Sequence, residues 1–163
     1  MANIIPISTV TVGSGGLATI QFIGIPQTYT DLEIKLSGRA SNPYIDITFN
    51  GNTSNRSSRY LYSTGSSVGS GTQAGFLGIE SSTSNTSNTF GSMSIYIPNY
   101  GSTNNKSFSA DSVQETNSTS AEMHLVSGLW SNTSPISSIE IYPEGSGTFS
   151  QYTTATLYGI RKY

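Results

Sequence analysis

The chain has 163 residues, enough to bury one hydrophobic core, and we expect a single β domain over 1–163. Charged residues make up 10% of the sequence and the formal net charge is −2. Seven Lys and Arg residues in all do not supply the basic face that nucleic acid requires, so we expect no nucleic-acid partner. The absence of Cys excludes disulfides and thiolate metal sites.

Runs of alternating apolar and polar residues in the first half of the chain predict strands. Residues 1–16 are expected to form an N-terminal arm or an edge strand. The strands predicted after this segment cover 17–25, 31–40, 44–50 and a short 59–63. Asn50-Gly51, at the end of the third of these runs, is a strong hairpin signal.

The second half continues the same pattern, and no segment shows a helical repeat over ten or more residues. The strands predicted there cover 90–98, 106–113, 121–130, 135–143 and 152–163. Short strands joined by Gly, Ser, Asn and Thr loops are typical of an antiparallel sandwich or barrel. In the last run we expect Leu157 in the core, and Tyr158 and Ile160 at the rim or against a neighbouring subunit.

The segment 51–89 interrupts the pattern because its composition is that of a linker. The stretches STGSSVGSGT and SSTSNTSNT are low in complexity, yet the apolar island AGFLGIE (74–80) lies between them. We expect long surface loops on one domain, which are exposed and entropically cheap to extend, instead of a boundary between two domains.

His124, in AEMHLV, is the single histidine of the chain and the first candidate for catalysis. Strand alternation places it beside Glu122, whose carboxylate could orient the imidazole as a general base. Serines are so frequent that one near His124 is expected by chance, and no strand–turn–helix context for a nucleophile elbow is present. We therefore expect a surface or edge-strand histidine and no catalytic residue.

Carboxylates are the second candidates, because glycosidases use a pair of them in a cleft. Asp31 and Glu33 share a strand face, as any residues two apart do, and we expect solvent-facing carboxylates that provide solubility. The remaining candidates, which are isolated in sequence, are Asp46, Asp111, Glu115, Glu140 and Glu144. No zinc or calcium motif is present, and the glycine-rich GSGG and GSGT are not followed by a Lys and a helix, so no metal or cofactor is expected.

Aromatic residues allow two interpretations. Trp130 either ends a strand and packs in the core, or it stacks with exposed tyrosines against a sugar ring. Packing is the interpretation we favour. The tyrosines that belong to this set are Tyr29, Tyr44, Tyr60, Tyr62, Tyr96, Tyr100, Tyr142, Tyr152, Tyr158 and Tyr163.

Four stretches in a fixed order resemble a widespread group of tailed-bacteriophage virion proteins. The first is IPIS (5–8) followed by FIGIPQTYTDL (22–32), and the second is ITFNG (47–51). SIYIPNY (94–100) is the third, and GLWSNTSPISSIEIY followed by GSGTFSQYTTATLYGIRKY (128–163) is the fourth. None of these motifs is specific alone, and the resemblance fails mainly over 51–89.

The resemblance implies a jelly-roll β-sandwich of about 8–10 strands that is a non-enzymatic part of a virion. Such parts commonly form homotrimers and act as capsid decoration (cement) proteins, bound to the major capsid protein or another virion protein, or as tail components. The alternative is a tail-fibre or spike-associated carbohydrate-binding module that contacts a host glycan. The first residues lack the features of a secretory signal and no apolar run could span a bilayer, so we expect synthesis in the host cytoplasm, location in the virion and no membrane partner.

Overall fold

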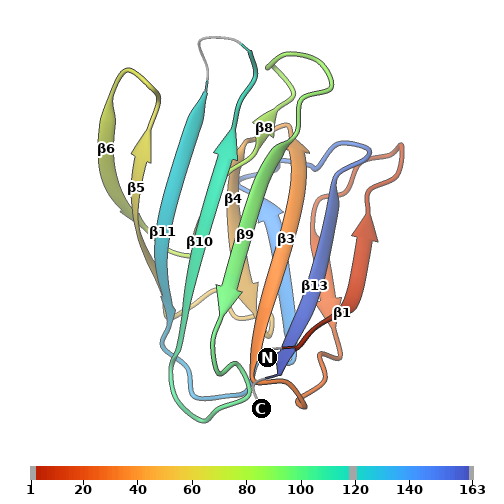
Figure 1. The fold of residues 1–163 in the computed structure, drawn as a ribbon, viewed down its shortest axis with the longest axis vertical. Helices are drawn as coiled ribbons and strands as arrows, with labels where there is room; N and C mark the ends of the chain where they lie inside the picture. The colour runs from red at the N-terminus through yellow and green to blue at the C-terminus, as the bar shows by residue number, and fades with distance from the viewer. Residues whose placement is uncertain (1–2, 118–120, 162–163) are drawn as a thin grey trace.

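The computed structural model describes residues 3–117 and 121–161. These residues form thirteen β-strands and no helix, arranged in two sheets that pack face to face (Figure 1). The expected all-β sandwich is therefore confirmed.

The larger sheet has nine strands and the smaller sheet has four. In spatial order the larger sheet contains β1 (Asn3–Thr11), β13 (Thr154–Arg161), β3 (Asp31–Ala40), β9 (Gly91–Ile97), β10 (Lys106–Gln114), β11 (Glu122–Trp130), β5 (Arg56–Ser63) and β6 (Val68–Gln73), with β8 (Ser81–Ser82) beside β3. The smaller sheet contains β2 (Ile20–Ile23), β12 (Ser138–Pro143), β4 (Tyr44–Phe49) and β7 (Phe76–Ile79). Neighbouring strands are antiparallel except for the parallel pair β3–β8.

Eight of these strands wind between the sheets as a jelly roll, with the order β1-β13-β3-β9 facing β2-β12-β4-β7. The remaining strands extend one sheet only. β5 and β6 follow β4 in the chain, β10 and β11 follow β9, and the two insertions meet where β11 pairs with β5. The larger sheet is therefore much wider than a jelly roll requires.

Alternation along the strands decides which side chains are buried, as the sequence predicts for β3, where Leu32, Ile34 and Leu36 face inward. Both sheets contribute to one cluster of buried side chains. At its centre the Phe49 ring of the smaller sheet lies 5.5 Å from the Trp130 ring of the larger sheet.

β13 lies between β1 and β3, so the C-terminal run is an interior strand of the larger sheet. Leu157 is fully buried, which confirms its expected place in the core. Ile160 is also buried and Tyr158 is half-buried. For the N-terminal segment the sequence left two alternatives, an arm or an edge strand. Residues 3–11 form the edge strand β1, which pairs with β13.

The segment 51–89 differs most from expectation, because much of it forms strands instead of loops. Asn50 and Gly51 have φ of 52° and 66° and make a tight turn, but β4 and β5 lie in different sheets and do not pair as a hairpin. The hairpin is instead β5–β6, in which the rings of Tyr60 and Tyr62 cover the opposing glycines of β6. A side chain at either glycine would collide with these rings.

Candidate functional site

His124 lies in the interior of the larger sheet, with its side chain in the core, so the expected surface or edge-strand position is wrong. Its Nε2 lies 3.1 Å from Glu122 Oε2, and its Nδ1 has no hydrogen-bond partner among the described residues. The imidazole is packed among Tyr60, Tyr62 and Phe76, with ring centroids 5.5–5.7 Å away. A histidine side chain that is enclosed by aromatic rings and only 4% exposed has a packing role.

Asp31 and Glu33, the first pair of candidate carboxylates, are bound by neighbouring side chains and backbone and do not line an open cleft. Asp31 is fully buried and accepts hydrogen bonds from Tyr96 Oη (2.6 Å) and the Asn99 backbone N–H (2.9 Å). Glu33 pairs with Lys35 at 2.6 Å. The expectation of solvent-facing carboxylates is therefore wrong for Asp31, which fastens the turn after β9 to the start of β3.

A second pair of carboxylates, Asp46 and Glu144, comes together although the two are far apart in sequence. The Gln73 side-chain amide donates to both, with 3.5 Å to Asp46 Oδ1. Burial first and the Glu144 carboxylate second raise the pKa of Asp46 to about 6, while Arg56 lowers it. These contacts connect β4, β6 and the end of β12, so the pair serves to hold the hairpin β5–β6 against the smaller sheet.

The aromatic candidates divide between core and surface. Trp130 is buried at the end of β11, which confirms the packing interpretation and removes it from any sugar-binding surface. Tyr152 is the most exposed of the described tyrosines at 68%, and it has a φ of 72° in the loop before β13.

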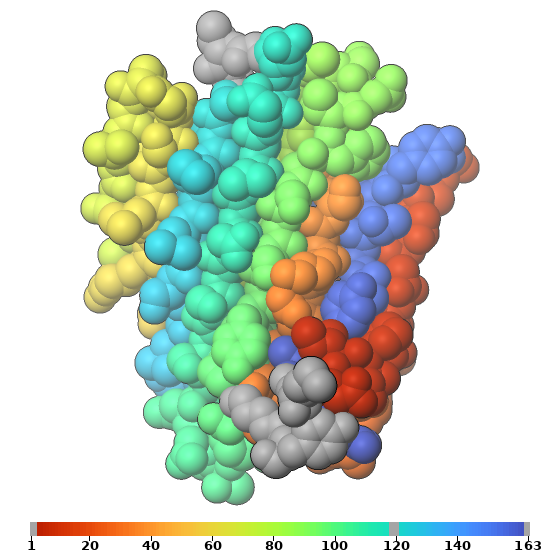
Figure 2. All heavy atoms as spheres, viewed as in Figure 1, coloured from red at the N-terminus to blue at the C-terminus, as the bar shows by residue number. Residues whose placement is uncertain are grey.

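The broadest candidate surface is an apolar patch on the outer face of the larger sheet, the face that Figure 2 shows. We call it the outer-face patch; its members are Leu61, Val68, Val113, Met123 and Leu125, which are 43–84% exposed. Leu125 of β11 pairs directly with Leu61 of β5, and Met123 pairs with Val113 of β10. Cross-strand partners point to the same face, so these side chains form one continuous surface.

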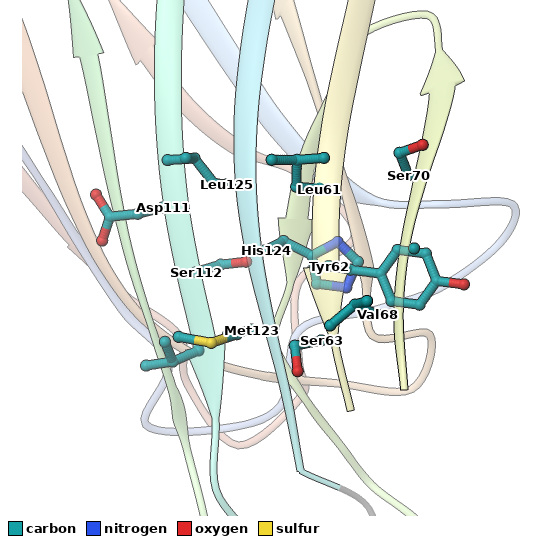
Figure 3. A pocket seen from close by; sticks show the side chains of 12 residues that line it. Leu61, Tyr62, Ser63, Val68, Ser70, Asp111, Ser112, Met123, His124 and Leu125 are labelled. Atoms are coloured by element: carbon teal, nitrogen blue, oxygen red, sulfur yellow. The ribbon is translucent and has the colours of Figure 1, made fainter. Parts of the chain in front are cut away.

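Two hollows of about 770 Å³ each lie on this face, side by side along the hairpin β5–β6. Leu61 and Leu125 border both of them and therefore form a ridge between the two, as their adjacent positions in Figure 3 indicate. Val68, Val113 and Met123 line the first hollow only.

Each hollow has one charged residue on its outer-facing wall, and the two charges are opposite. Asp111 of β10 lies at the first hollow and Arg59 of β5 at the second. Both are exposed, and with the described residues neither side chain makes an ion pair or hydrogen bond. Asp111 pairs with Leu125, which pairs with Leu61, and Arg59 lies two residues before Leu61 on β5. The Cα atoms of Arg59 and Asp111 are therefore two strands and two residues apart, about 12 Å.

Sequence reasoning missed this surface because the alternation of β11 gives the wrong impression of which face is buried. Met123 and Leu125 are more apolar than His124 and Gly128, yet they face outward. Both faces of β11 carry apolar residues, Met123 and Leu125 on one and Val126 and Trp130 on the other, so the sequence alone does not tell which face is buried.

Within 3–117 and 121–161, no cluster of three or more His, Cys, Asp or Glu side chains suited to a metal ion occurs. The same part of the chain contains no helix long and apolar enough to cross a membrane. Comparisons with protein-family models, curated proteins and solved structures return no match to this chain. The outer-face patch and its two oppositely charged hollows are thus the strongest functional feature of the molecule.

Proposed function

We propose that this chain is a non-catalytic structural protein of a tailed-bacteriophage particle, a decoration protein that assembles as a homotrimer on the head. The proposal combines a surface built for protein contact with the four ordered sequence stretches that resemble phage virion proteins. The burial of the one histidine among aromatic rings supports a role without chemistry.

The observation that carries the proposal is the outer-face patch. Single exposed apolar residues are common on proteins, whereas contiguous apolar patches mark interaction surfaces. Here five large apolar side chains gather over β5, β6, β10 and β11, while the outer positions of β3 and β9 carry Ser, Glu, Lys and Tyr side chains. A concentration of this kind is expected where another molecule covers the surface.

The rest of the surface suits a particle component. It is rich in hydroxyl and amide groups, and only 10% of the residues are charged. Contacts made by such groups are screened little by salt, unlike ion pairs between exposed charges. An assembly held by apolar and hydroxyl contacts would keep its strength in water of varying salinity.

Binding to particles tests the proposal. Purified protein is mixed with particles assembled without it, and the bound fraction is measured after sedimentation over a range of concentrations. We expect saturable binding at a fixed number of copies for each particle. Absence of the chain from purified complete particles, together with no binding to particles that lack it, would refute the proposal.

A second candidate function is glycan binding at a tail fibre or spike, and Tyr152 is the observation that favours it. An exposed aromatic ring held at positive φ in a loop of hydroxyl-bearing residues is a surface on which a sugar ring could stack. Binding to a glycan array that is lost in Tyr152→Ala would support this function. An array without any signal for the wild-type protein would exclude it for the glycans displayed.

A further inference from the structure

The two hollows of the outer face complement each other. Asp111 lies at one and Arg59 at the other, and the ridge of Leu61 and Leu125 separates them. An interface that pairs a surface with itself must bring residue i against residue j and j against i. Arg59 and Asp111 satisfy this condition, because each offers the charge that the other lacks.

We propose that the outer-face patch binds a second copy of this chain across a two-fold axis, with Arg59 of each copy against Asp111 of the other. This inference names the partner of the patch and rests on the assembly role proposed above. The two-fold axis lies parallel to the sheet and passes midway between Arg59 and Asp111, perpendicular to the line that joins them. Rotation about this axis places the first hollow of one copy against the second hollow of the other. Leu125, on the strand between them, then lies next to the axis, and the apolar ridges of both copies are buried together.

The edge of the sheet beside the patch is unprotected. β6 is an edge strand, and its sequence VGSGTQ contains neither a proline nor a charged residue. Natural proteins usually protect exposed edges with such residues, because an unprotected edge pairs with other chains. A second copy packed over the neighbouring face would bury the exposed apolar side chains there, including Val68 of β6, which is 84% exposed.

A two-fold contact joins chains in pairs. Alone it produces a dimer, and between two of the homotrimers proposed above it produces a hexamer. Each contact pairs opposite charges, so Arg59 and Asp111 attract across it.

Charge reversal tests the pairing by sedimentation velocity over a concentration series. Arg59→Asp places acid against acid at both ends of the contact, and Asp111→Arg places base against base. We expect each single variant to associate at least about tenfold more weakly than wild type, because like charges at an interface cost several kcal/mol. The double variant R59D/D111R restores both opposite-charge contacts and should associate like wild type.

Mixing the two single variants gives the sharpest result. The Arg59→Asp chain carries an acidic group in both hollows, and the Asp111→Arg chain carries a basic group in both. The two chains are therefore complementary at both ends of the contact, so an equimolar mixture should associate although neither variant does so alone. Glu140→Lys, a charge reversal on the smaller sheet, is the matched control and should behave like wild type.

Three outcomes would overturn the inference: a wild type that shows no two-fold association, single reversals that associate normally, or a mixture that stays dissociated. Melting curves establish that each variant folds. If a reversal does not fold, Arg59→Gln and Asp111→Asn replace the two reversals, and either one associating as tightly as wild type would also refute the pairing. Particle binding by wild type with no self-association would contradict this inference alone, whereas failure of particle binding contradicts the proposed function.

Discussion

Replacing Glu80 by Gln should stabilise the protein at neutral pH. Glu80 is fully buried between β7 and β8, where its Oε2 accepts a 3.1 Å hydrogen bond from the Gly38 backbone N–H. Its Oε1 has no partner among the described residues. A Cβ atom at Gly38 or Gly91 would lie within 3.0 Å of this carboxyl. The two glycines therefore leave room for the carboxyl and for no larger group.

The direction of the effect follows from the pKa. Burial raises the pKa of Glu80 well above its ordinary value of 4.5, and the hydrogen bond from Gly38 opposes this shift only in part. Between the unfolded and the folded pKa, the folded protein keeps a proton that the unfolded chain releases. The free energy of unfolding therefore falls as the pH rises through this interval, by about 1.4 kcal/mol for each pH unit.

The amide of Gln resembles the protonated carboxyl in size and stays neutral, so the Glu80→Gln variant should lack this loss. One kcal/mol shifts the melting temperature of a chain of this length by about 2–4 °C, which predicts a difference that grows by about 3–6 °C per pH unit between the unfolded and the folded pKa of Glu80. The two proteins should melt close together at the acidic end.

Thermal melting from pH 4 to pH 8 measures the difference between wild type and Glu80→Gln. Asp46→Asn is the matched comparison, because the pKa of Asp46 is raised to about 6 and its contribution to the pH dependence should therefore end near that pH. Parallel melting curves for wild type and Glu80→Gln across the whole range would refute the assignment of a buried, protonated Glu80.

Three further changes test the fold. Arg39→Ala should lower the free energy of unfolding by at least about 2 kcal/mol and make the loop 83–89 sensitive to protease, because the guanidinium donates to backbone carbonyls of Thr83, Asn85, Thr86 and Thr89. Urea unfolding measures the stability and limited proteolysis the loop. A variant as stable and as resistant as wild type would contradict this prediction. Gly128→Ala should cost about 1–3 kcal/mol in urea unfolding, because its methyl would meet the Phe108 ring, and an unchanged midpoint would count against this packing. Deletion of 155–163 should abolish cooperative folding, since it removes an interior strand; a sharp melting transition of the truncated chain would refute this.

The sequence predicts the strands whose pattern matches their surroundings. Along the middle of β3, Leu32, Ile34 and Leu36 face the core and Lys35 and Ser37 face solvent, so alternation gives both the strand and its orientation. Leu157 of β13 follows the same rule. These strands belong to the jelly roll itself, where one face is always covered by the opposite sheet.

The hairpin β5–β6 shows where local patterns are insufficient. VGSGTQ has the composition of a linker, and it forms a strand because Tyr60 and Tyr62 of β5 cover Gly71 and Gly69 across the pair. Each ring belongs to a different strand from the glycine that it covers, so the compensation appears only once the register is known. The outer-face patch depends on this hairpin and could not be predicted for the same reason.

Electron microscopy of the complete particle tests the central claim most directly. The account predicts density for the sandwich on the particle surface, with Leu61, Leu125 and their neighbours buried against a second copy and Arg59 facing Asp111. A particle map without this chain, or one in which the outer-face patch is exposed to solvent, would contradict it.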